Sequence, residues 1–124
     1  MPEGETHTLE ITRDLPLTLV RGFLRGVDGH LPDKAREDLA LLVTELASNA
    51  IRHGEAPADV EVTWLAGTAR LTVRSGGPPF SWHSAWVQPG TEGGLGLVLV
   101  DRMADRWGIK RVDGHNEVWL ELDH

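Results

Sequence analysis

The chain has 124 residues, of which 40% are hydrophobic and 25% charged, a composition typical of one globular domain with a single core. Twelve Lys and Arg against nineteen Asp and Glu give a net charge of −7, the wrong sign for a protein that binds the phosphate backbone of nucleic acid. No apolar run approaches the roughly 18 residues of a membrane span, and the polar start MPEGETHTLE is unlike a signal peptide. The chain has no cysteine and so can form no disulfide. We therefore expect one soluble cytoplasmic domain over residues 1–124.

The first half of the chain predicts one strand followed by two helices. Weak alternation of apolar and polar residues over positions 6–12 indicates the strand. Pro16 can open a first helix whose apolar positions recur at helical spacing as far as Val27. Pro32 opens a second helix, and Gly54 stands where its C-terminal cap belongs. The second helix is the strongest element because its apolar stripe is continuous, comprising Ala35, Leu39, Leu42, Val43, Leu46 and Ala50.

A hairpin and a long loop follow the second helix. Apolar residues alternate over 60–64 and 69–73 on either side of a turn at Ala66-Gly67, which predicts two paired strands. Residues 75–94 are rich in glycine and proline and show no period, so they predict a loop of about twenty residues. A loop of that length in so small a domain is usually a lid, a binding loop or a disordered segment.

The remaining residues predict a third helix and a second hairpin. Helical spacing runs over 95–107, and the hairpin joins 108–112 to 117–122 through a turn at Asp113-Gly114. Hairpins dominate this order of elements. We therefore expect an α/β two-layer sandwich in which three helices cover one face of a mixed, mainly antiparallel sheet.

Polar residues on the second helix form the first candidate site. Glu45 and Asn49 are spaced i,i+4, so both lie on one side of the helix outside its apolar stripe, and His53 follows one turn later. A carboxylate beside an amide oxygen could act as a general base and as a Mg²⁺ ligand. The alternative interpretation is a solvated helix face.

Two glycine-rich turns form the second candidate site. Ser75-Gly76-Gly77 closes the first hairpin, and the sequence GGLGL at 93–97 opens the third helix. Glycine lets the backbone approach a ligand closely, and free N–H groups at the start of a helix can bind an anion. Either turn could also do no more than end a strand or begin a helix.

The order of these motifs along the chain is more specific than any one motif alone. In order, the chain has the helical sequence ELASNAIRHG, a strand that ends in a glycine-rich turn, a long loop, and GLGL at the start of a helix. This order resembles the GHKL ATP-binding fold of gyrase, heat-shock chaperones, histidine kinases and mismatch-repair ATPases. More narrowly, GLGLVLVDRMADRWG is similar to the compact anti-sigma-factor serine/threonine kinases and their stand-alone actinobacterial-like relatives. The resemblance spans the whole chain and implies ATP and Mg²⁺ as cofactors.

The resemblance implies a role for each polar residue of the second helix. Glu45 matches the general base that activates an incoming serine hydroxyl. Asn49 matches the residue that holds Mg²⁺ on the nucleotide, and His53 matches the end of the same motif, near the nucleotide.

The resemblance also assigns the glycine turns and the loop between them. Ser75 and Gly77 fall in the first glycine box, which faces the adenine. Residues 78–93 match the ATP lid. The second glycine box, whose N–H groups and helix dipole would hold the phosphates, comprises Gly94, Leu95, Gly96 and Leu97.

Three residues depart from the family pattern. Ser75 replaces the aspartate that receives the adenine amino group, and a charge-assisted hydrogen bond of this kind contributes about 1.5–3 kcal/mol. Glu117 aligns with a threonine near the adenine pocket, where it could replace the missing carboxylate, obstruct the pocket, or be a solvated strand residue. Glu92 aligns with a basic residue that neutralises the terminal phosphate, and residues 75–93 contain no Lys or Arg.

Two functions stay open on these residues. One is a regulatory ATP-binding protein that sequesters a sigma factor or phosphorylates a serine on a small antagonist protein, with a homodimer as a further expectation because family members commonly dimerise. The other is a degenerate member that has lost nucleotide binding and acts as a protein-interaction module. Whether the chain is an enzyme depends on whether phosphoryl transfer proceeds with Glu92 in place of a cation.

Aromatic and histidine residues add little to this choice. Trp82 and Trp86 in the lid could contact a partner, pack over the nucleotide, or anchor the lid on the core. Trp107 and Trp119 favour core or sheet packing. The histidines show no metal-ligand spacing such as HExxH, so we expect no transition-metal site.

Overall fold

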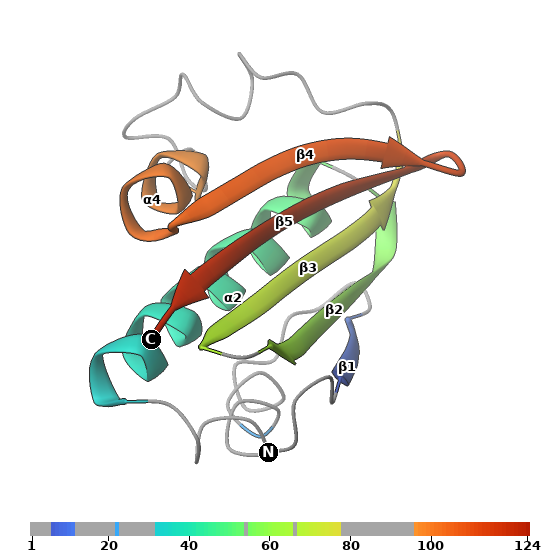
Figure 1. Cartoon of the computed structure of the whole chain (residues 1–124). Coiled ribbons are helices and arrows are strands. Elements are labelled where there is room, and N and C mark those ends of the chain that lie inside the picture. Colours follow the sequence, from blue (N-terminus) through green and yellow to red (C-terminus); the bar gives the residue numbers. More distant parts are fainter. Residues whose placement is uncertain (1–5, 12–21, 23–31, 54, 66, 78–95) are drawn as a thin grey trace.

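The computed structural model describes residues 6–11, 22, 32–53, 55–65, 67–77 and 96–124. In these residues a five-stranded antiparallel sheet is covered on one face by two helices (Figure 1). The elements are β1 (Thr6–Ile11), α2 (Asp33–His53), β2 (Glu55–Leu65), β3 (Thr68–Gly76), α4 (Gly96–Met103), β4 (Arg106–Val112) and β5 (His115–Asp123). The predicted two-layer α/β class is confirmed.

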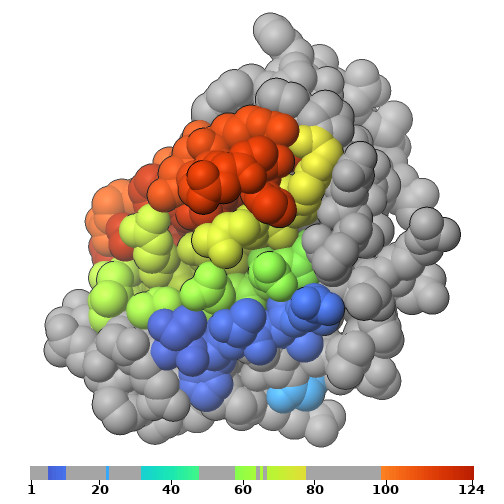
Figure 2. All heavy atoms as spheres, turned by 90° about the vertical axis from the view of Figure 1, so that its right-hand side faces the viewer, coloured from blue at the N-terminus to red at the C-terminus, as the bar shows by residue number. Residues whose placement is uncertain are grey.

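The sheet has the strand order β1-β2-β3-β5-β4. Every strand pairing among the described residues is antiparallel, as expected for a sheet built from hairpins. In Figure 2 the strands form successive bands, from blue β1 through green β2 and yellow β3 to the red and orange final hairpin. The predicted turn of that hairpin is confirmed, with Asp113 and Gly114 at φ values of 50° and 78°, as a two-residue turn requires.

The apolar stripe of α2 builds the core against the sheet. Leu39, Leu42, Val43 and Leu46 are buried and face a layer of β-branched and leucine side chains from the strands. Full burial of each such side chain contributes about 1.5–3 kcal/mol, which fixes the helix on this face. The strand side chains of the core include Val60, Val62, Leu71, Val73, Val118, Leu120 and Leu122.

The third helix is shorter than its spacing predicts. The pattern over 95–107 extends the helix to Trp107, but α4 ends at Met103 and Trp107 belongs to β4. The backbone N–H of Asp105 donates to the Glu121 carbonyl at 2.9 Å, so the chain joins the sheet edge before another helical turn can form. The indole of Trp107 still packs against the core, as predicted. The first predicted helix, over 16–27, lies outside the described residues apart from Gly22, as does the predicted lid over 78–93.

Alternation along β3 separates two sets of side chains. Ala69, Leu71, Val73 and Ser75 are buried toward the helices, on what we call the inner face, whereas Arg70, Thr72 and Arg74 lie on the outer face. Residues opposite one another in the ladder share a face. Every functional side chain on β5 can therefore be assigned to a face from its partner on β3.

The outer face holds a network of ion pairs beside an indole. Arg74 and Lys110 approach Glu117, and Arg70 and Arg106 approach Glu121, with nitrogen–oxygen distances of 2.8 to 3.4 Å. The guanidinium of Arg70 also lies 4.6 Å from the centroid of the Trp119 ring. Trp119 is thus a sheet-packing residue, as predicted.

Candidate functional site

Ser75 is the last inner-face side chain of β3 before the glycine turn. The residue is 2% exposed, and its Oγ has no hydrogen-bond partner in the part of the chain that the structure describes. A buried hydroxyl without a partner costs about 1–3 kcal/mol, so native proteins rarely keep one without a reason. A ligand that reaches this end of the inner face would find an unsatisfied donor and acceptor.

Asn116 lies opposite Ser75 in the β3–β5 ladder and is equally buried at 2% exposure. Its Oδ1 accepts a hydrogen bond from Arg111 Nη1 at 3.1 Å, and its Nδ2 donates to the Gly76 carbonyl at 3.3 Å. The same Arg111 nitrogen donates to the Gly77 carbonyl at 2.9 Å. These contacts from the second hairpin fix the backbone of the first glycine turn.

The conformation of this turn depends on glycine. Gly77 has a φ of 93°, a region of backbone space that side chains with a Cβ rarely adopt. The turn therefore presents bare backbone immediately after Ser75, which is the arrangement expected where a planar ligand approaches the chain closely.

The C-terminal end of α2 meets this turn. His53 is the last residue of the helix, and Glu55, which begins β2, pairs directly with Gly76 of β3. Asn49 lies on the same helix about one turn earlier, and Glu45 about two turns earlier. The structure thus brings the end of the helix motif and the first glycine box, which the sequence predicts as parts of one site, to the same end of the sandwich.

Glu45 is the one acid of this helix motif. Its side chain is partly buried and lies outside the core cluster. Among the residues that the structure describes, no hydrogen bond or ion pair engages its carboxylate. A carboxylate is a type of group that can act as a proton acceptor.

The second glycine box is described only in part. The structure begins α4 at Gly96, which agrees with a helix opened by GLGL. Leu97 lies in the first turn of that helix, whereas Gly94 and Leu95 are outside the described residues. The helix packs on α2 and on β4, so its first residues belong to the helical layer on the inner face.

The structure does not bring Glu117 to Ser75. Glu117 lies opposite Arg74 on the outer face, 3.1 Å from its guanidinium and 3.4 Å from Lys110, with a side chain that is 8% exposed. Neither a replacement carboxylate nor an obstruction of the adenine pocket has support in this geometry. The side chain is also no solvated strand residue, because the two cations cover it.

Asn116 and Arg111 belong to the candidate site but are not among the residues predicted from the sequence. The sequence does contain a signal for Asn116. Asn116 stands at the next alternate position before the apolar Val118, Leu120 and Leu122, so it belongs to the same, inner face of the strand. Arg111 gave no such signal because it stands 34 residues from Gly77 along the chain. It brings a positive charge to a stretch whose own sequence has none.

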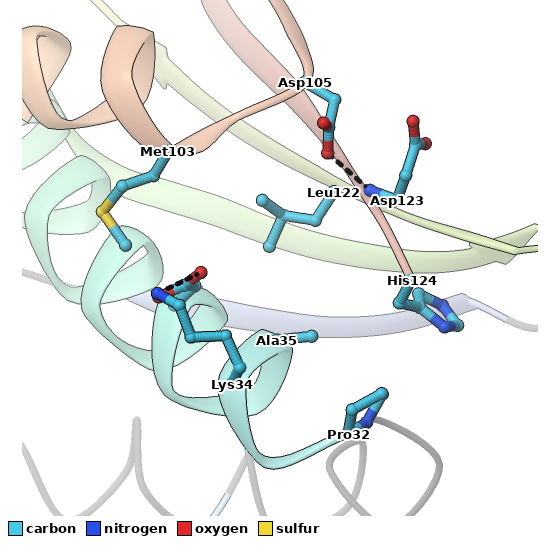
Figure 3. Close-up of a pocket in the computed structure, with 9 residues that line it drawn as sticks. Pro32, Lys34, Ala35, Met103, Asp105, Leu122, Asp123 and His124 are labelled. Atoms are coloured by element: carbon cyan, nitrogen blue, oxygen red, sulfur yellow. Dashed lines mark hydrogen bonds and ion pairs between the residues drawn. The ribbon is translucent and has the colours of Figure 1, made fainter.

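A hollow lies at the N-terminal end of α2, away from Ser75. It measures about 220 Å³ and is lined by apolar Ala35, Met103 and Leu122 and by several charged groups (Figure 3). The charged groups are already paired, with Lys34 Nζ 2.9 Å from Asp38 and the Asp123 N–H donating to Asp105 at 2.7 Å. This hollow includes none of the candidate site residues that the sequence analysis names.

The described residues include no group of three or more His, Asp or Glu side chains placed to hold a metal ion. None of the described helices is both long and apolar enough to cross a membrane.

Comparison with known proteins identifies the family. A model of the histidine kinase-like ATPase domain matches residues 14–122. The chain belongs to this histidine kinase-like ATPase family. The resemblance to GHKL proteins is thereby confirmed. No curated protein matches the sequence.

Solved structures show the same fold at low identity. The RsbU and RsbW domains of Rv1364c from Mycobacterium tuberculosis match with a TM-score of 0.71 and 16% identity over 96% of this chain and 32% of that one. The blue-light activated histidine kinase EL346 from Erythrobacter litoralis matches with a TM-score of 0.59 and 20% identity over 86% of this chain and 40% of that one. The histidine kinase domain of the same protein matches with a TM-score of 0.57 and 19% identity, over 91% of this chain and 63% of that one. The ATPase-family domain described here therefore spans less than two thirds of each of these chains.

Proposed function

We propose that this chain is a regulatory ATP-binding protein of the anti-sigma-factor kinase type. The observation that carries the proposal is the buried, unpartnered Ser75 hydroxyl, which lies beside the Gly76-Gly77 turn where the C-terminal end of α2 meets β3. An unsatisfied polar atom on the inner wall of a histidine kinase-like fold fits a base-binding pocket. The likeness of fold to a chain with an RsbW domain supports the regulatory type.

Each predicted site residue has a role in this proposal. Asn49 would hold Mg²⁺ on the nucleotide, and His53 would lie near the nucleotide at the end of the helix. The N–H groups of the second glycine box, Gly94–Leu97, and the dipole of the helix that follows would hold the phosphates. Bound Mg·ATP supplies the electrophilic phosphoryl group. Glu45 is the general base that removes the proton from an incoming serine hydroxyl.

Charge favours sequestration over phosphoryl transfer as the main activity. Phosphoryl transfer depends on positive charge around the transferred group, and residues 75–93 contain no Lys or Arg, with Glu92 at the aligned position. Arg111 donates to the Gly77 carbonyl, so its charge lies by the first glycine turn. We propose that the protein binds a sigma factor or its small antagonist protein as a cytoplasmic homodimer, and that phosphorylation of the antagonist serine is slow.

A degenerate, nucleotide-free interaction module is the second candidate. Ser75 and Glu92 favour it because each replaces a group that would strengthen nucleotide binding. Glu117 gives it no support, since its carboxylate is paired on the outer face.

Calorimetric titration with ATP, with and without Mg²⁺, separates the two candidates. We expect Mg²⁺-dependent binding at micromolar to submillimolar ATP, and we expect Asn49→Ala to abolish the effect of Mg²⁺. Thr72→Ala, on the outer face of β3, is the matched control and should bind as the wild type does. Absence of binding at millimolar ATP would overturn the nucleotide-binding function and leave the interaction module as the remaining candidate.

A further inference from the structure

The group that faces the base site is a neutral hydroxyl. A serine hydroxyl donates one hydrogen bond and accepts two, whereas a carboxylate only accepts. The Ser75 Oγ is buried and has no partner among the described residues, so its hydrogen is free to turn toward a ligand or away from it. The ligand therefore decides whether the Ser75 hydroxyl donates or accepts the hydrogen bond.

The described neighbours of Ser75 do not make the site favour a ligand that donates a hydrogen bond over one that accepts it. The Asn116 amide opposite it is engaged at both ends, by Arg111 at Oδ1 and by the Gly76 carbonyl at Nδ2. The other described inner-face side chains beside it, Ala58 directly opposite on β2 and Val73 on β3, are apolar. The carboxylate of Glu117, which follows Asn116 on β5, faces the outer side and its pair of cations.

Adenine and hypoxanthine differ in what they offer such a hydroxyl. The 6-amino group of adenine donates a hydrogen bond, which the serine oxygen accepts. The 6-oxo group of hypoxanthine or guanine accepts a hydrogen bond, which the serine O–H donates. A carboxylate at the same place would accept from the amino group and repel the oxo group, because both would be acceptors.

We propose that Ser75 makes this domain indifferent to the purine 6-substituent, so that it takes 6-oxopurine nucleoside triphosphates as readily as ATP. This inference rests on the proposed nucleotide site. Neutral hydrogen bonds of either polarity contribute similar, modest amounts, so the dissociation constants of Mg·ATP and Mg·ITP should agree within about threefold. Inosine triphosphate is the sharper probe because it lacks the 2-amino group of guanine.

Competition titrations of Mg·ATP against Mg·ITP test the proposal on the wild type alone. A ratio of dissociation constants within about threefold supports it, and a preference of tenfold or more for ATP overturns it while leaving the nucleotide site intact. Absence of binding by both nucleotides at millimolar concentration overturns the proposed function together with this inference.

Substitution at Ser75 tests which group is responsible. Ser75→Asp should raise the preference for ATP to about tenfold or more, because the carboxylate gains a charge-assisted bond from the amino group and repels the oxo group. Ser75→Ala should weaken both nucleotides and leave the ratio near one. Thr72→Asp places the same charge on the same strand but on the outer face, and it should leave the ratio unchanged. A ratio that does not move in a folded Ser75→Asp variant contradicts the role of Ser75.

Discussion

Arg74 Nη2 lies 3.1 Å from Glu117 Oε2 on the outer face of the sheet, while Ser75, the next residue of β3, points to the inner face. One step along a strand thus separates an ion-pair network from a candidate ligand site. The charges of Arg74 and Lys110 are neutralised on the side away from the helices. The inner wall that a nucleotide would contact is left with a neutral hydroxyl and an amide.

Glu117→Thr should lower stability without changing nucleotide affinity. The substitution leaves Arg74 and Lys110 without their shared carboxylate, which should lower the free energy of unfolding by about 1–3 kcal/mol. Urea denaturation measures this loss, and calorimetric ATP titration should give a dissociation constant within about twofold of the wild type. A tenfold change in ATP affinity would place Glu117 in the pocket and refute the assignment of faces.

Gly108→Ala should lower the free energy of unfolding by disturbing the packing on the outer face of the sheet. A Cβ at this position would lie 2.8 Å from Nε1 of Trp119, so the indole would have to move away from its stacking position under Arg70. We expect a loss of about 1–3 kcal/mol, as for other overpacked sites. In a Trp119→Leu background the same alanine should cost less than about 1 kcal/mol, because the clashing ring is gone. Equal costs in both backgrounds would show that the indole is not the reason for glycine here.

Asp123 should carry part of the acid sensitivity of the fold. The Arg106 guanidinium and then the Thr68 hydroxyl lower the pKa of the Asp123 carboxyl below its usual 3.8. Because the pKa is lower in the folded state, the stabilisation is complete above 3.8 and is lost as the pH falls through the lowered value. An NMR titration of the Asp123 carboxyl should give a midpoint below 3.8, and Arg106→Gln should return it toward that value. A midpoint unchanged by Arg106→Gln would remove Arg106 as the cause.

The order of elements was predictable from the sequence because it depends on local periods. The apolar stripe of α2 repeats at helical spacing, and apolar and polar residues alternate along the strands of both hairpins. Each element can therefore be recognised from a short stretch of sequence. Trp107 shows the limit of this reasoning. It continues the spacing of α4, but a hydrogen bond from Asp105 to the distant Glu121 draws the chain into the sheet.

The candidate site was less predictable because it depends on register. Assigning Glu117 to the pocket required knowing which of two adjacent residues on β5 faces Ser75, and a shift of one residue reverses the answer. The ladder gives that place to Asn116. Contacts such as that of Arg111 with the Gly77 carbonyl arise only when the two hairpins lie side by side.

Amide chemical shifts during titration with Mg·ATP test the central claim most directly. If the nucleotide binds where α2 meets the end of β3, the amides of Asn49, Ser75 and Gly77 should move. Those of outer-face Thr72 and Trp119 should move far less. Shifts confined to the outer face, or no shifts at millimolar Mg·ATP, would contradict the account.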